Sequence, residues 1–101
     1  MITIRQTQVF RSWLRELRDR RAAARIAIRI DRLALGNPGD IRAVGAGVSE
    51  MRIDYGPGYR VYFMCQGHAL TLLLCGGDKS TQQADIARAQ RLAREHRAQE
   101  I

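Results

Sequence analysis

The hydrophobic residues in the first third of the chain recur at helical spacing, in two stripes separated by a polar corner. The first stripe is Val9, Phe10, Trp13, Leu14 and Leu17, and the second is Ala23, Ile26, Ala27, Ile30, Leu33 and Ala34. This spacing predicts two amphipathic helices. Thr7 can cap the first helix, and Gly36 followed by Pro38 ends the second. The corner at Asp19-Arg20-Arg21 is short, so the two helices should form an antiparallel hairpin.

Beyond this hairpin the apolar residues alternate with polar ones, which is the period of a β-strand. Residues 48–63 predict two strands on either side of a glycine-rich turn, and residues 2–5 predict a further short strand at the start of the chain. Residues 69–75 are almost all apolar, so we expect a strand that is covered on both faces.

The two central strands should form a hairpin whose register follows from the apolar pattern. We take the loop as the three residues 56–58. The predicted pairs are Ile53 with Val61 and Met51 with Phe63 on the core face, and Arg52 with Tyr62 and Asp54 with Arg60 on the other face. A slip of one residue would mix charged and core residues on both faces.

The chain should leave the sheet at Gly76-Gly77-Asp78-Lys79. Ser80 and Gln83 then form a capping-box pattern that opens a last helix, which should end near Gln99. The order of elements is therefore β-α-α-β-β-β-α. It predicts an α+β fold, a small antiparallel meander sheet packed by an N-terminal helical hairpin and a C-terminal helix.

The length of 101 residues predicts a single domain that spans residues 1–101. The first ten residues lack the apolar core of a signal peptide, and no apolar run approaches the roughly 20 residues that span a bilayer. We therefore expect a cytoplasmic protein with no membrane partner. Cys65 and Cys75 are too few for a disulfide framework or a metal site, and we expect both to be buried thiols.

The charge of the chain is strongly positive, with a net charge of +7 and an isoelectric point near 10.7. This balance predicts a polyanionic or acidic partner, either nucleic acid or an acidic protein. The arginines of the helices are candidate RNA contacts, and the alternatives are solvated helix faces or, on the last helix, partner docking. These candidates are Arg18, Arg20, Arg21, Arg25, Arg88 and Arg91.

Several charged residues should gather at one end of the sheet. Arg60 follows the glycine-rich turn, and Lys79, the one lysine beside 16 arginines, follows the last strand. Arg52, Tyr62 and Glu50 should lie on the same face, leading away from that end. These residues form either a phosphate site or a plain surface ion-pair cluster.

Such a cluster suits the cleavage of RNA through its own 2′-OH. That reaction needs removal of the 2′ proton, protonation of the 5′ leaving oxygen and neutralisation of charge on the phosphorane. Arg52 and Arg60 would stabilise charge, because arginine does not readily release a proton. Lys79, Tyr62 or Glu50 would carry protons. No cofactor is expected.

The segments VSEMRIDYGPGYRVYF and LLLCGGDKSTQQADIARA resemble the RelE/ParE toxin superfamily. More narrowly, they resemble the phage-derived Gp49-like, HigB-type addiction module killer proteins. The resemblance implies a RelE-like sheet backed by helices, toxin activity and a cognate helix-turn-helix antitoxin of the HigA-like kind. RelE-like and HigB-like members are endoribonucleases that cleave mRNA on the ribosome, whereas ParE-like members inhibit DNA gyrase without enzymatic activity.

The resemblance also assigns residues. Arg60 matches the arginine of RelE-type nucleases, Arg52 matches a basic residue on the preceding strand, and Lys79 lies close to a basic catalytic position. Glu50 stands where those enzymes often have a second lysine, and the last helix lacks their tyrosine. We therefore expect a ribosome-dependent mRNA endoribonuclease. The alternatives are a gyrase inhibitor and a simple RNA-binding domain.

Overall fold

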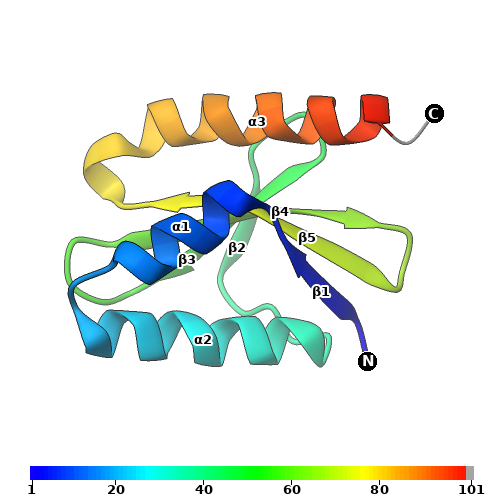
Figure 1. The fold of residues 1–101 in the computed structure, drawn as a ribbon. Coiled ribbons are helices and arrows are strands. Elements are labelled where there is room, and N and C mark those ends of the chain that lie inside the picture. Colours follow the sequence, from blue (N-terminus) through cyan, green and yellow to red (C-terminus); the bar gives the residue numbers. More distant parts are fainter. Residues whose placement is uncertain (100–101) are drawn as a thin grey trace.

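A five-stranded sheet forms the middle layer of the computed structural model, which describes residues 1–99 (Figure 1). The elements in chain order are β1 (Thr3–Gln6), α1 (Gln8–Glu16), α2 (Arg20–Ala34), β2 (Ile41–Ala43), β3 (Val48–Ile53), β4 (Tyr59–Gln66), β5 (Leu70–Gly77), the 3₁₀ turn η1 (Lys79–Thr81) and α3 (Gln82–Gln99). The strands lie in the order β1-β5-β4-β3-β2. β1 runs parallel to β5, and the other neighbouring pairs are antiparallel. The α+β class and the meander are confirmed.

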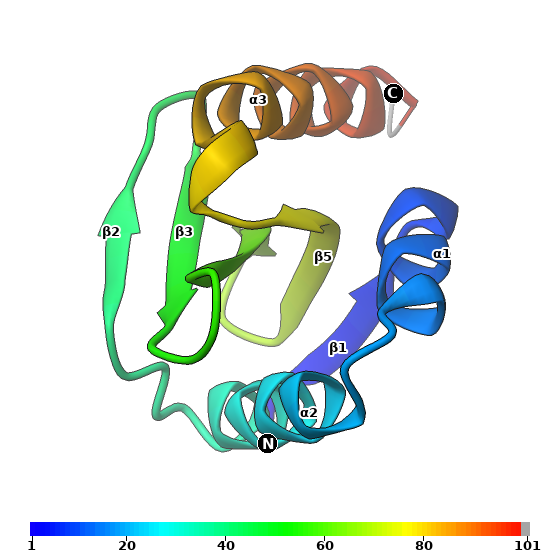
Figure 2. The same ribbon diagram turned by 90° about the vertical axis from the view of Figure 1, so that its left-hand side faces the viewer.

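The sheet curves between helices on both of its faces. Figure 2 shows α3 over one face and α2 over the other, with α1 beside β1 at one edge. One apolar cluster joins α1 and α2 to the sheet and consists of Phe10, Ile26, Leu33, Met51, Ile53, Val61, Phe63 and Leu73. A second cluster joins α3 to the opposite face and consists of Val48, Tyr62, Met64, Leu72, Leu74, Cys75, Ala89 and Ala93.

The first two helices are present, and Thr7 caps α1 as predicted. The corner between them lies at residues 17–19, earlier than predicted, because Asp19 caps α2 with its side chain. Arg20 and Arg21 therefore begin α2 and do not form the corner. The helices also splay apart: α1 packs on β5 and β1, and α2 packs on β3 (Figure 2).

Strand β2 is an element that the sequence pattern did not predict. It has three residues, all of them exposed, so it is too short and too open to show an apolar alternation. It pairs antiparallel with β3 and places Arg42 opposite Glu50. This edge strand thus brings a cation next to a residue of the candidate site.

The predicted register of the β3–β4 hairpin is wrong by two residues. Arg52 pairs with Arg60, and Glu50 pairs with Tyr62, so the loop is the five-residue segment 54–58. A shift by two keeps every side chain on its predicted face, because the side-chain period of a strand is also two. The apolar pattern therefore fixed the faces but could not fix the loop length.

Strand β5 is buried along nearly its whole length, as predicted. It continues through Gly77, so the two glycines belong to the strand and not to a turn. Asp78, not Ser80, caps the following turn, and α3 begins at Gln82. Among residues 1–99 no helix is long and apolar enough to cross a membrane.

The cysteine predictions are partly wrong. Both thiols are free, as expected, but only Cys75 is buried, whereas Cys65 is exposed. A bulge between Tyr62 and Phe63 and a shifted turn place Cys75 opposite Tyr62. Cys65 pairs with Thr71 near the far end of the hairpin. The Cys65 side chain is thus exposed although Thr71 opposite it is buried.

Replacement of Gly76 by alanine should destabilise the fold, because its Cβ would overlap the indole ring of Trp13. Overpacking of this kind lowers the free energy of unfolding by about 1–3 kcal/mol, which urea denaturation would measure. The additional change Trp13→Leu should make the loss caused by Gly76→Ala smaller than in the wild-type background. Losses that simply add would contradict the predicted overlap.

Candidate functional site

A buried carboxylate lies beneath the candidate site. Glu50 on β3 is 0% exposed. Its Oε1 accepts a hydrogen bond from Arg42 Nε at 2.8 Å, and its Oε2 accepts from Tyr62 Oη and Gln82 Nε2, both at 2.9 Å. The Nε of Arg60 lies 3.6 Å from the same Oε2. A buried charge is tolerated only when it is paired and hydrogen-bonded in this way.

The hydrogen-bond partners of Glu50 determine the protonation states of Glu50 and Tyr62. Burial would raise the pKa of Glu50, but the hydrogen bonds from Arg42, Gln82 and Tyr62 outweigh it and hold that pKa below its ordinary value. Burial, together with the hydrogen bond to Glu50, raises the pKa of Tyr62 far above its ordinary value. At neutral pH the carboxyl is therefore ionised and the phenol is protonated.

This burial argues against the expected roles of Glu50 and Tyr62. Both side chains are 0% exposed, so in this arrangement neither can exchange a proton with a bound substrate. Glu50 instead lies 3.6 Å from the Nε of Arg60, and Tyr62 donates a hydrogen bond to the Glu50 carboxylate. Sequence alternation predicted the correct face for both residues but not that α3 would cover that face.

The cationic residues of the rim meet around one glycine. The Nη1 of Arg60 donates a hydrogen bond to the carbonyl oxygen of Gly58 at 2.6 Å. A Cβ added to Gly58 would lie 3.1 Å from that Nη1 and 3.5 Å from the Cβ of Lys79. The N–H of Lys79 donates to the carbonyl of Pro57 at 3.3 Å, which ties η1 to the β3–β4 loop. The backbone positions of Arg60 and Lys79 therefore lie beside the same loop at one end of the sheet.

Arg52 and Arg60 lie directly opposite each other on neighbouring strands. Like charges at such positions destabilise a sheet. Each has an acidic partner: Arg52 Nη2 lies 3.0 Å from Asp40 Oδ1, and Arg60 points to Glu50. The acidic partners therefore keep two cations close together at the rim.

One open hollow of about 380 Å³ collects these groups, which we call the rim hollow. It is lined by Asp40, Arg52, Ile53, Asp54, Gly58, Tyr59, Arg60 and Lys79. Asp40 and Tyr59 were not predicted as site residues. Asp40 lies in a loop with no periodic signal. Tyr59 lines the hollow because the β3–β4 loop is longer than predicted and Tyr59 pairs with Ile53 next to it. Burial, and then the charges of Asp19 and Asp78, raise the pKa of Tyr59.

The N-terminal end of α2 lies next to the same loop. The guanidinium of Arg25 lies 4.7 Å from the ring centroid of Tyr55, whose hydroxyl donates to Asp19 at 3.1 Å. Arg18, Arg20 and Arg21 are exposed around this end. Arg20 and Arg21 occupy the positive end of the helix dipole, where cations are unfavourable, and Asp19 partly offsets them.

The predicted RNA contacts on α3 are not brought to the rim hollow. Arg88 lines a separate hollow of about 360 Å³ with Trp13 and Glu16. Arg91 lies 3.9 Å from Glu95 one turn further along α3. α3 covers the face of the sheet opposite to α2 (Figure 2). Within residues 1–99 no group of three histidine, cysteine or acidic side chains gathers as a metal site would require.

The chain matches a family model and a known relative by sequence. Residues 12–96 match the family model described as phage-derived protein Gp49-like. A protein of Haemophilus influenzae (strain ATCC 51907 / DSM 11121 / KW20 / Rd), which carries the name "Uncharacterized protein", is 54% identical over 94 residues. That match covers 93% of this chain and 95% of the Haemophilus protein.

Replacement of Glu50 by glutamine should lower the free energy of unfolding at pH 7 by about 3 kcal/mol, because it leaves the buried guanidinium of Arg60 without its anion. The pKa of Glu50 is lowered in the fold, so its stabilisation is present above the unfolded pKa of about 4.3 and is lost as the pH falls through the folded value. The difference between wild type and Glu50→Gln should therefore shrink on acidification, as measured by urea denaturation at pH 7 and pH 3.

Tyr62→Phe is the matched control for this experiment. It removes one hydrogen bond to the carboxylate but leaves the charge, so its loss should be about 1–2 kcal/mol and should change less with pH. A Glu50→Gln deficit that stays constant from pH 7 to pH 3 would contradict an ionised, stabilising Glu50.

Proposed function

We propose that this chain is the toxin of a type II toxin–antitoxin pair and cleaves mRNA on the ribosome. The premise is that the chain belongs to the phage-derived Gp49-like protein family. The family is associated with toxin–antitoxin systems. The resemblance of the two sequence segments to RelE-type and HigB-type nucleases supports the finer assignment. The observation that carries the proposal is the convergence of Arg60 and Lys79 around Gly58, with Arg52 directly opposite Arg60.

The proposed reaction is an attack of the RNA 2′-OH on the adjacent phosphorus. The O2′–P bond forms and the P–O5′ bond breaks, which gives a 2′,3′-cyclic phosphate and a 5′-hydroxyl. Negative charge builds up on the phosphorane, and fixed cations stabilise it most when they need no rearrangement. Arg60 is placed for this role, because its Nη1 donates to the Gly58 carbonyl at 2.6 Å and its buried Nε lies 3.6 Å from the Glu50 carboxylate without a hydrogen bond.

Two proton transfers complete the reaction. The Lys79 ammonium is exposed at the rim and would supply a proton to the departing O5′. Asp54 also lines the rim hollow and is an exposed carboxylate, whereas Asp40 is paired with Arg52. We propose that Asp54 accepts the 2′ proton, in place of the buried Glu50 and Tyr62.

We also propose an antitoxin partner that neutralises this surface. The net charge of +7 favours association with an acidic protein segment, and electrostatic attraction would speed that association. A HigA-like helix-turn-helix antitoxin, expected from the family resemblance, would supply such a segment.

Lys79→Ala should reduce mRNA cleavage by a factor of about 100 or more, because it removes the proposed proton donor and one cation. The measurement is cleavage of a reporter mRNA in a purified translation system, with toxin added at equal concentrations. Arg60→Lys should also lose activity, because lysine cannot make both the Gly58 and Glu50 contacts.

Arg94→Ala is the matched control, since Arg94 is an exposed arginine on α3 and its loss removes the same charge elsewhere. It should cleave like the wild type. Intact mRNA and normal translation with the wild-type protein would end the nuclease proposal. Inhibited DNA supercoiling in the same preparation would then support the gyrase alternative.

A single 2′-deoxy nucleotide on the 5′ side of the cleaved bond should abolish cleavage at that bond, because the attacking group is absent. The wild-type products should end in a 2′,3′-cyclic phosphate and a 5′-hydroxyl, which mass spectrometry distinguishes from a 3′-hydroxyl and a 5′-phosphate. Cleavage that persists next to the deoxy nucleotide would rule out attack by the 2′-OH.

A further inference from the structure

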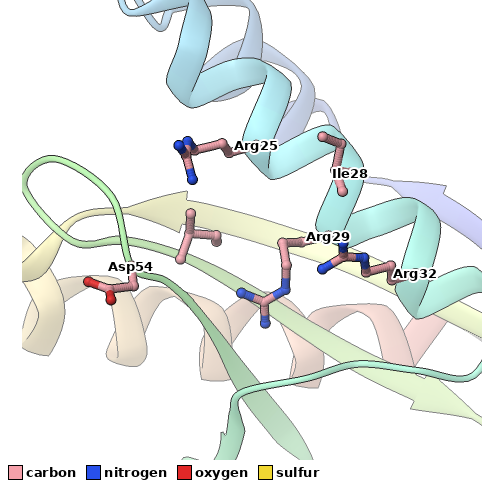
Figure 3. A pocket seen from close by; sticks show the side chains of 6 residues that line it. Arg25, Ile28, Arg29, Arg32 and Asp54 are labelled. Atoms are coloured by element: carbon pink, nitrogen blue, oxygen red, sulfur yellow. The ribbon is translucent and has the colours of Figure 1, made fainter.

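We infer that the groove between α2 and the end of β3 binds the RNA strand next to the scissile phosphate, an inference that rests on the proposed function. This groove, which we call the α2 groove, has a volume of about 300 Å³. It is lined by Arg25, Ile28, Arg29 and Arg32 of α2 and by Ile53 and Asp54 across from them. Figure 3 shows the arginine side chains reaching from the helix toward the opening, with Asp54 on the other side.

The α2 groove adjoins the rim hollow. Ile53 and Asp54 line both, so a chain that leaves one can enter the other directly. Arg29 also links the two, because its Nη1 donates to the carbonyl of Arg52 at 2.6 Å. A substrate held at Arg60 and Lys79 would therefore have its next nucleotides beside α2.

The three arginines have the spacing that a polyanion requires. Positions 25, 29 and 32 share one face of a helix, and the first and last are seven steps apart, or about 10 Å along the axis. Phosphates of a stacked single strand follow one another at about 3.4 Å along its axis. The row therefore covers about three nucleotides. Arg29 is fixed by the carbonyls of Arg52 and Pro38, so its charge is held in place before any ligand arrives.

The ends of the row offer two different contacts. The guanidinium of Arg25 lies over the Tyr55 ring, and a base can stack on such a guanidinium–aromatic pair. Arg32 is exposed, and within residues 1–99 its guanidinium makes no hydrogen bond or ion pair, whereas its backbone carbonyl accepts from Leu35 and Asn37. It is free to take a phosphate.

The chemistry of the walls favours RNA over a protein segment. Within the groove's own lining the apolar surface comes from two isoleucines, and the Tyr55 ring outside that lining is already paired with Arg25, so the lining lacks the aromatic anchors typical of protein interfaces. Asp54 would repel a phosphate, which directs the strand to the arginine wall formed by α2. The strand then passes Asp54 at the junction with the rim hollow, where a 2′-OH would meet the carboxylate.

The test uses a single-stranded oligoribonucleotide that carries 2′-O-methyl groups throughout, so that it cannot be cleaved. Its affinity for the wild type, Arg32→Ala and Arg94→Ala is measured from 50 to 200 mM salt. Arg32→Ala should reduce the slope of log affinity against log salt by about 0.7, the contribution of one phosphate contact in a single strand. Arg94→Ala should leave the slope unchanged, and both exposed substitutions should leave the melting temperature unchanged.

Equal slopes for Arg32→Ala and Arg94→Ala would overturn the inference, because binding would then reflect overall charge alone. A polyglutamate peptide that loses affinity with Arg32→Ala, while RNA does not, would overturn it in favour of a protein ligand. The readout is independent of cleavage. An active nuclease with equal slopes would refute only the α2 groove, and a reduced slope without any mRNA cleavage would refute only the nuclease.

Discussion

The arrangement of this molecule depends on a carboxylate that has no access to solvent. Glu50 takes partners from three directions: Arg42 on the edge strand, Tyr62 and Arg60 on the neighbouring strand, and Gln82 at the start of α3. Each contact satisfies part of a buried charge that would otherwise be very unfavourable. The same contacts hold β2, β4 and α3 against β3. The group that fixes the sheet thus also fixes Arg60, the central cation of the proposed site.

The rim above this carboxylate concentrates positive charge in ways that cost stability. Arg52 faces Arg60 across the hairpin, and Arg20 and Arg21 begin α2 at the positive end of its dipole. Asp40 and Asp19 reduce these repulsions while Arg52, Arg20 and Arg21 stay exposed, and Arg60 is 9% exposed. A fold under no other constraint would gain from neutral residues at these positions. Their charges become favourable when a polyanion binds, which supports the proposed role of this end of the molecule.

The sequence predicted much of this fold because its apolar periods are clear. Both N-terminal helices, the central hairpin and the doubly covered strand β5 follow from periods of 3.6 and 2. The predictions that failed depend on information that a hydrophobic period does not contain. A hairpin shifted by two residues keeps every side chain on the same face of the sheet. The hydrophobic pattern therefore could not predict the pairing of Arg52 with Arg60. The short strand β2 and the Asp40 loop have no period, so their contributions to the site were missed.

Glu50 shows why the chemistry of the site was harder to predict than its location. Its neighbours along β3 alternate between core and polar types, so the local pattern is that of an exposed acid on the outer face. Its burial depends on Gln82 and on α3 lying over that face, contacts that join residues 32 positions apart. Placing Arg60 and Lys79 at one end needed only the order of the strands and two turns. Assigning proton transfer needed to know which acids reach solvent, and that is decided by long-range packing. The open carboxylate of Asp54, and not the enclosed one of Glu50, is therefore the group that can meet a substrate.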